Sequence, residues 1–402
     1  MRQAVRTRRG ARGHLTRGTT LTIAEERQEL PISHEQRPQG SPKVAVVFTR
    51  PDTVLEDIER ALRLADYPAH MPRDAATLLK INISWQHFFP ACSTTPWQLE
   101  GAIRALQALG YGEPAGKGII PAQNGTVVVD SREGEANNKH KPVLDKYGLQ
   151  SVHLNDPEVP WVPYQPKSPL LVLDKVYPDG IRIPALFPGK NILHLPTMKT
   201  HVFTTITGAM KNAFGGLLNF QRHWTHSVIH ETLVDLLAIQ REIHPGVFAL
   251  TDGTFAGDGP GPRAMRPYVK NTLIAGADQV AVDAIAAKLM GFDPLSIKFI
   301  RLAHERGLGC GDPREIQVVG EDITGVDWRF SGSENTFASR GQKLIYWGPL
   351  KPLESLLLRS PLVPWAYAAS NLYHNGYWLN LIGKRRIRQM LQTDWGKLWQ
   401  GY

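Results

Sequence analysis

Short apolar runs alternate with amphipathic segments from residue 43 to about residue 320, and this alternation constrains the fold more than any other feature of the chain. Strands are expected at Val44–Phe48, Leu78–Ile83, within 118–129, and at Asn191–Leu195, Val247–Leu250, Asn271–Ala275 and Ile316–Val319. Helices are expected at Asp52–Leu64, Pro96–Leu109, Thr225–Glu242, Asp278–Met290 and Ile297–Arg306. Strands that alternate with helices build mainly parallel sheets with helices on both faces, so the expected fold class is α/β.

The composition of the sequence differs between three regions, and these differences suggest a domain organisation. Residues 1–42 are polar and lack periodicity, which predicts a disordered basic tail. Residues 43–326 are expected to form the α/β domain, with two lobes, 43–139 and 190–326, joined by a Pro- and Gly-containing bridge or hairpin-bearing insertion at 140–189. Residues 327–402 contain six of the ten tryptophans and a Lys-Arg-Arg run at 384–386, which predicts a helical, aromatic and basic accessory extension.

Charge and composition exclude several classes of protein. The formal net charge is +9, and much of the excess lies in the first 17 residues, which contain six arginines and no acid. A nucleic-acid-binding arm, a transit peptide and a disordered tail all fit such a segment. The arm has no aromatic residue for base stacking, and the body has no familiar nucleic-acid module, so no specific nucleic acid is expected. Two cysteines cannot form a disulfide scaffold.

No stretch of about 18 uncharged apolar residues occurs, so no membrane-spanning helix is expected. Together with the scarcity of cysteine, this predicts a cytoplasmic protein, with peripheral attachment to a membrane left open.

The densest polar segment follows the strand that ends near Leu195, and we expect it to form a loop that carries the functional site. Ligands of open α/β sheets gather outside the carboxyl ends of strands. Lysine, histidine and threonine side chains, with glycines that permit close backbone approach, suit a phosphate or carboxylate. The residues concerned are Lys199, His201, Thr207, Gly208, Lys211, Asn212 and Gly215. The alternative is a solvated polar loop.

Two further segments suggest a metal ion. His226 and His230 are four residues apart and would share one face of a helix, a spacing that can bind a transition metal. Asp252 closes a strand and opens a glycine-rich loop that includes Gly259, and such a carboxylate can bind Mg²⁺ or act as a base. Asp283 lies among apolar residues in a helix and requires a partner, either a buried lysine or the site itself. Hydrogen-bonded structural histidines and aspartates are the alternative.

A third group of polar residues lies near the first strands. Lys80 and Asn82 end a strand, and Thr95 immediately precedes a helix that begins at Pro96. A helix amino terminus attracts anions, so these residues are expected to bind the ligand, although Thr94 or Thr95 can equally serve as a helix cap.

These motifs, in this order, resemble the DUF362 family of bacterial and archaeal proteins over residues 43–322. The resemblance rests on Lys80-x-Asn82, Thr95-Pro96, Pro196-x-x-Lys199-Thr200-His201, Thr207-Gly208-x-x-Lys211-Asn212-x-x-Gly215, Asp252-Gly253 and Asp278-x-x-Ala281-x-Asp283. Ile81 stands where the family usually has proline. Many relatives carry a ferredoxin-like cysteine domain; this chain does not, so no intrinsic iron–sulfur cluster is expected. A more distant likeness is to the N-terminal part of nickel-pincer lactate racemases.

The leading functional hypothesis is an enzyme that acts on a small anionic substrate or cofactor. Lys199, His201, Lys211 and Asp283 are its expected catalytic residues, since groups of different pKa can serve as acid and base around one substrate. Isomerisation, group transfer and cofactor-borne redox chemistry remain open. The alternative is a non-catalytic ligand-binding or accessory protein that docks, through residues 345–402, on a redox enzyme or a membrane surface.

Overall fold

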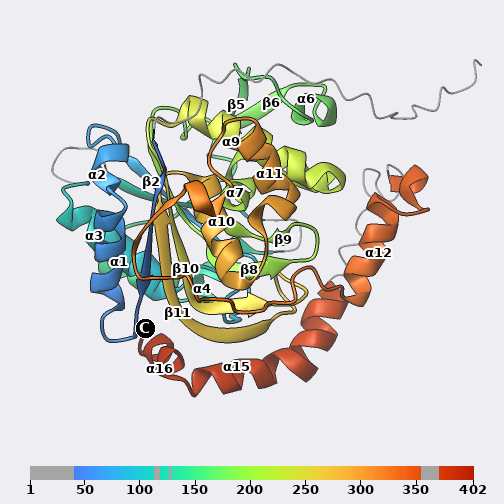
Figure 1. Cartoon of the computed structure of the whole chain (residues 1–402). Coiled ribbons are helices and arrows are strands. Elements are labelled where there is room, and N and C mark those ends of the chain that lie inside the picture. Colours follow the sequence, from blue (N-terminus) through green and yellow to red (C-terminus); the bar gives the residue numbers. More distant parts are fainter. Residues whose placement is uncertain (1–39, 113–117, 126–128, 355–370) are drawn as a thin grey trace, which may run out of the picture. The chain divides into compact units, whose positions relative to one another are not determined.

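The computed structural model describes residues 40–112, 118–125, 129–354 and 371–402 (Figure 1). Most of the expected basic tail, residues 1–39, therefore lies outside the described residues. The apolar residues Leu356–Leu358 and the prolines Pro361 and Pro364 of the predicted extension also lie outside them.

The elements follow the expected alternation. The strands are β1 (Lys43–Phe48), β2 (Thr77–Ile81), β3 (Ile119–Gln123), β4 (Val152–His153), β5 (Trp161–Tyr164), β6 (Ile181–Pro184), β7 (Asn191–Leu195), β8 (Thr197–His201), β9 (Thr205–Ile206), β10 (Val247–Asp258), β11 (Arg266–Gly276) and β12 (Gln317–Gly320). The larger helices are α1 (Val54–Leu64), α3 (Pro96–Ala108), α4 (Ser131–Asn137), α5 (His140–Lys146), α9 (Ile229–Ile243), α10 (Gln279–Met290), α11 (Lys298–Glu305) and α12 (Phe337–Tyr346). Shorter helical segments are α2 (Tyr67–His70), α6 (Leu173–Val176), α7 (Gly208–Asn212), α8 (Phe214–Leu217) and the 3₁₀ segments η2 (Phe220–Val228), η3 (Pro294–Ser296), η4 (Pro313–Glu315) and η5 (Lys351–Leu353). The chain ends in η6 (Leu372–Gly383), α15 (Lys384–Leu391) and α16 (Asp394–Gly401).

One mixed sheet organises the fold and confirms the α/β class. Its strand order is β12-β1-β11-β10-β7-β2-β3-β4, with β8 and β9 attached beside β10. Neighbouring strands are parallel except where β11 pairs with β1 and β10, and where β9 pairs with β8. Strands from 43–139 and from 190–326 share this sheet: β1 lies between β12 and β11, and β2 and β3 follow β7. Residues 140–189 contain an antiparallel hairpin of β5 and β6.

The two faces of the sheet bury separate apolar cores. Val44 and Val46 of β1 face one core, and Ala45 and Val47 face the other, as the two-residue period of a strand requires. Helices α7, α9, α10 and α11 cover the first face, while α1 and α3 cover the second (Figure 1). This double cover explains why the strands read as continuous apolar runs.

Two segments expected as loops are strands instead. Thr197–His201 forms the buried strand β8, which lies parallel to β10 through the pairs Asp252–Thr197 and Gly257–Lys199. Strand β10 continues through Asp252 to Asp258 with a bulge after Gly253. The glycines of this stretch serve close packing rather than a turn, because a Cβ at Gly253 would lie 2.5 Å from Met198 Sδ.

The C-terminal helices pack against the second core. Trp378 and Trp395 are only 4% and 2% exposed, and the Trp395 indole donates a hydrogen bond to Asn271 Oδ1 at 2.7 Å. The Trp399 ring stacks on Phe88 with ring centroids 3.9 Å apart. Packing therefore accounts for these three tryptophans of the aromatic extension.

Candidate functional site

The predicted polar segment lies at the carboxyl ends of two neighbouring parallel strands, β2 and β7. Lys80 and His194 are paired residues near those ends. Asn212, from the short helix α7, donates to the Lys80 carbonyl at 2.8 Å and lies 3.3 Å from His194 Nδ1. Asn212, one of the residues predicted from the sequence, therefore connects helix α7 to the ends of strands β2 and β7.

Helix α7 is fixed in place by Asp283 from α10. The carboxylate of Asp283 accepts hydrogen bonds from the backbone N–H groups of Ala209 at 2.5 Å and Met210 at 3.0 Å. Gly208 has a φ of +77°, and a Cβ there would lie 2.3 Å from Asp283 Oδ1. The Gly208–Asp283 pair is therefore a positioning device for α7, and the partner of Asp283 is a helix amino end rather than a lysine. Burial raises the pKa of this carboxyl to about 7.

Four cationic side chains gather around α7 and α8: Lys80, Lys199, Lys211 and Arg222. Among the described residues, the acceptors of three of them are all neutral. Lys80 Nζ donates to the Ile81 carbonyl at 2.6 Å. Lys199 Nζ donates to the Cys92 carbonyl at 2.8 Å and to Thr197 Oγ1 at 2.7 Å. The guanidinium Nη2 of Arg222 donates to the Gly125 carbonyl at 2.5 Å.

Lys211 is the least satisfied of the four cations. Within the described part of the chain its ammonium has no hydrogen-bond or ion-pair partner and lies 5.2 Å from the centre of the Phe214 ring. Lys80 Nζ and Arg222 Nη1 each lie 3.6 Å from the point where a Cβ of Gly215 would stand. The absent side chain of Gly215 therefore leaves space between two cations.

The electrostatics of this cluster are uncompensated. Burial, followed by repulsion from Arg222, lowers the pKa of Lys80 to about 7. Burial, followed by repulsion from Lys199 and Arg222, lowers the pKa of Lys211 to about 7. Burial also lowers the pKa of Lys199 to about 8. Because the described residues offer these lysines no carboxylate, an incoming anion would be their counter-charge.

Histidines border the cluster. His201 in β8 is 4% exposed, and its Nδ1 accepts the Phe203 N–H at 3.2 Å. Burial and the nearby charges of Lys211, His226, Lys199 and His230 hold the pKa of His201 well below its usual range. Burial likewise lowers the pKa of His226 to about 4. Both imidazoles are therefore neutral at pH 7, and each can exchange one proton with a ligand.

An aromatic wall covers the histidine side of the cluster. The His226 ring lies 5.8 Å from Phe203, 5.7 Å from Phe214 and 5.9 Å from Tyr346, measured between ring centroids. Tyr346 belongs to α12, and the neighbouring Trp347 indole donates to the Ser227 carbonyl at 2.9 Å. Part of the predicted accessory extension therefore packs directly on the candidate site.

Other predicted site residues form hydrogen bonds within the protein. The Thr207 hydroxyl donates to the Lys199 carbonyl. The Asn82 side-chain amide donates, at 3.3 Å, to the Cys92 carbonyl, which also accepts from Lys199 Nζ. Thr95 caps α3 by accepting the Gln98 N–H and also donates to Asp252 at 2.5 Å. The Gly259 carbonyl accepts a hydrogen bond from Thr200 at 2.7 Å. Asp252, fully buried, uses its second oxygen to accept the Thr254 N–H at 2.7 Å.

The four predicted metal ligands do not converge. Asp283 and Asp252 hold different segments, as described above. His226 lies in the 3₁₀ segment η2 and bonds to the His223 carbonyl, whereas His230 lies in α9 and stacks on Phe299 at 6.0 Å. In the described part of the chain, no three of the four predicted ligands bring ligand atoms within 4.8 Å of one another. Among the described residues, the one group with three clustered potential ligands lies elsewhere, at His304, Cys310 and Glu315.

Sequence reasoning missed Arg222 as a member of the cationic cluster. Arg222 follows the short helix α8, which contains Gly215 and Gly216, by a few residues, and this proximity along the chain is the signal that links it to the lysines. Arg222 is 7% exposed.

These features define the class of the protein. It is an α/β protein with a polar, lysine-rich candidate site at the carboxyl ends of its parallel strands. The chain belongs to the DUF362 family: the family model, described as a domain of unknown function, matches residues 77–288, which include Lys80 through Asp283. One curated relative, Thylakoid-associated protein sll1697 of Synechocystis sp., is 27% identical over 143 residues, or 32% of this chain. That match covers 43% of the relative's length. No solved structure matches the chain.

Proposed function

We propose that the protein is an enzyme that binds a small phosphate- or carboxylate-bearing substrate or cofactor at the cationic cluster of Lys80, Lys199, Lys211 and Arg222. The observation that carries the proposal is the gathering of four cations whose described partners are carbonyls, a hydroxyl and an aromatic ring. Maintaining uncompensated positive charge at such depth lowers stability, and proteins retain it where a ligand supplies the opposite charge.

Proton transfer is the chemistry that the cluster supports best. A lysine with a pKa of about 7, as for Lys211, is close to the value at which a group can both accept and return a proton near neutral pH. His201 adds a neutral imidazole on the same side of the cluster. Lys80, Lys199 and Arg222 would bind the anionic group, while Lys211 or His201 moves a proton on the bound molecule. Isomerisation and group transfer both use such a step.

The test is calorimetric titration with sulfate, which stays a dianion across the neutral range, so that any change in affinity reports the protein. Lys211→Met keeps the length and apolar stem of the side chain and is expected to weaken sulfate binding at least roughly tenfold, since a partly buried charge contact is worth more than about 1.4 kcal/mol. The matched control is Lys141→Met, because Lys141 is exposed and paired with Asp145 at 2.9 Å. Equal sulfate affinity in the wild type and Lys211→Met, with both folded, would refute the proposal.

A second candidate function is attachment to an anionic membrane surface through η6 and α15. Three apolar side chains of η6 are strongly exposed: Leu372 at 75%, Tyr377 at 56% and Leu381 at 66%. Three exposed cations, Lys384, Arg385 and Arg388, follow in α15. Apolar side chains beside cations suit the interface of an anionic bilayer. Within the described residues, no helix combines the length and apolarity needed to cross a bilayer.

Sedimentation with vesicles tests this second function. Binding to vesicles that contain anionic phosphatidylserine, but not to neutral phosphatidylcholine vesicles, is expected. The double variant Tyr377→Ser, Leu381→Ser should lose it, and a matched change of the exposed Leu344 and Leu353 to Ser should not. Failure of the wild-type protein to sediment with anionic vesicles would contradict it and leave the anion-binding proposal untouched.

A further inference from the structure

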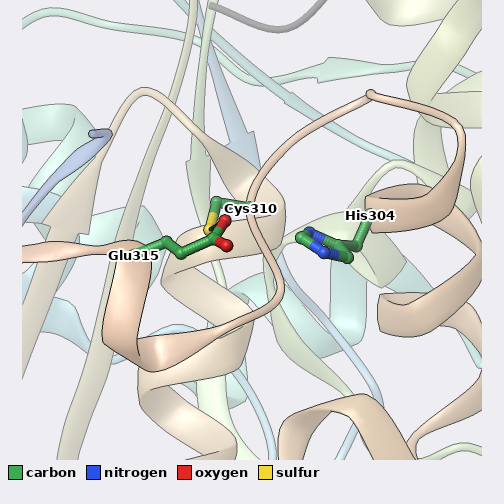
Figure 2. Close-up of side chains that lie close together, drawn as sticks. All are labelled: His304, Cys310 and Glu315. Atoms are coloured by element: carbon green, nitrogen blue, oxygen red, sulfur yellow. Dashed lines mark hydrogen bonds between the residues drawn. The ribbon is translucent and has the colours of Figure 1, made fainter. Parts of the chain in front are cut away.

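Three side chains of different donor types meet between α11 and β12, away from the cationic cluster. His304 lies near the end of α11, Cys310 in the following loop, and Glu315 at the end of η4. One potential ligand atom from each lies within 4.8 Å of the others. Figure 2 shows Cys310 and Glu315 next to each other, with the His304 ring turned toward them.

The donor set itself selects a class of ion. A thiolate, an imidazole and a carboxylate together suit Zn²⁺, which accepts sulfur, nitrogen and oxygen ligands and has no strong geometric preference of its own. The two anionic ligands would neutralise a divalent ion. Three protein ligands leave one coordination position open, as is common where zinc also holds water or a substrate.

The loop is already shaped around these donors. The Cys310 N–H donates to Asp278 Oδ2 at 2.9 Å, which anchors the loop to the start of α10. The Cys310 thiol lies 3.7 Å from Glu315 Oε2, close to the separation of two ligands on one tetrahedral ion. Glu315 is exposed, so its carboxylate can adjust and an ion can enter from solvent.

The surrounding charges favour a cation. Asp278 and Glu315 both act electrostatically on Cys310. Asp312 also faces His304, although Arg314 pairs with Asp312 at 2.6 Å and offsets part of its charge. Arg241, near Asp278, offsets part of that charge in turn. Such a setting disfavours a free thiolate but stabilises a thiolate bound to a divalent ion.

We propose that His304, Cys310 and Glu315 form a three-ligand zinc site. On binding, the Cys310 thiol releases its proton to solvent and forms a sulfur–zinc bond, while a His304 ring nitrogen and a Glu315 carboxylate oxygen each donate a lone pair to the ion. The His304 Nδ1 atom accepts the Gly311 N–H at 3.1 Å in the metal-free arrangement, and coordination breaks this bond. The affinity that is measured therefore includes a rearrangement of the loop.

The experiment uses the full chain, stripped with a chelator and titrated with Co²⁺ and then Zn²⁺. One Co²⁺ per chain is expected to give the near-ultraviolet band of thiolate-to-cobalt charge transfer, and Zn²⁺ should displace it. Cys310→Ser should abolish the band, whereas Cys92→Ser, which changes the other cysteine, should retain it.

Glu315→Gln tests the site without touching the core, because this side chain is exposed. It is expected to weaken Zn²⁺ binding at least roughly tenfold and to abolish the rise in melting temperature that Zn²⁺ gives the wild type. Failure of the stripped wild-type protein to bind one metal ion per chain in the titration would overturn the proposal. So would a band that survives Cys310→Ser, since the ion would then be bound elsewhere.

Discussion

Replacement of Gly208 by alanine tests the reasoning about the clamp on α7. Two separate costs are expected. The φ of +77° lies in the left-handed region, where a residue with a Cβ loses roughly 1–2 kcal/mol. The new Cβ would also stand 2.3 Å from Asp283 Oδ1, so the carboxylate must move and lose at least one of its two backbone hydrogen bonds. A hydrogen bond to a charged group contributes about 1.5–3 kcal/mol, which brings the expected loss to about 2.5–5 kcal/mol.

The matched control is Gly189→Ala. Gly189 has a nearly identical φ of +75°, but a Cβ there meets nothing within 4 Å. It should therefore show the backbone cost alone, about 1–2 kcal/mol.

Urea unfolding, compared at equal m-values, gives the free energy of unfolding for the two variants and the wild type. Gly208→Ala should also weaken sulfate binding, because α7 carries Lys211, and Gly189→Ala should not. If the two variants lose the same stability, Asp283 does not clamp α7 and the argument is wrong.

Three further outcomes are expected. Sulfate affinity should fall as pH rises from 7 to 9, at least roughly tenfold per unit above pH 8, because free Lys80 and Lys211 have pKa values of about 7 and must take up protons to hold the dianion; a flat calorimetric profile would contradict this. Gly215→Ala should change the free energy of unfolding by less than about 1 kcal/mol, since its Cβ makes only ordinary contacts, yet weaken sulfate binding by filling the space between two cations; unchanged affinity would place the ligand elsewhere. Trp395→Ala should lower the free energy of unfolding by about 3–5 kcal/mol, against under about 0.5 kcal/mol for the exposed Tyr377→Ala, as measured by urea unfolding; equal losses would show that the C-terminal helices are not part of the core.

The sequence predicted the elements of the sheet well because their signals are local. An apolar run such as Val44–Phe48 identifies a buried strand whatever its neighbours are. The N-cap role of Asp278 was equally readable, and its side chain accepts the N–H groups of Val280 and Ala281. The order of the strands is not local, since it depends on which distant segments pair, so the sequence does not reveal that strands of 43–139 and 190–326 share one sheet.

The candidate site was predictable in part for the same reason. The sequence shows that a strand end lies close along the chain to three of the predicted catalytic residues, Lys199, His201 and Lys211. The partner of Asp283 is a pair of backbone N–H groups in another element, and no side-chain pattern encodes that. A spacing of four residues also does not disclose that His226 lies in a 3₁₀ segment while His230 lies in an α-helix that begins at Ile229.

The placement of β1 between β11 and β12 has a consequence for how the chain folds as it is synthesised. Val44–Phe48 pairs with 272–276, and Lys43–Val46 pairs with 317–320, so both neighbours of this strand are made more than two hundred residues later. At a synthesis rate of roughly 5–20 residues per second, an apolar strand waits on the order of ten seconds or more with both edges unpaired. Such a delay exposes the nascent chain to aggregation. The sheet is therefore complete only after residue 320 has been synthesised, and the yield of the protein in the cell should depend on chaperones that bind the emerging chain.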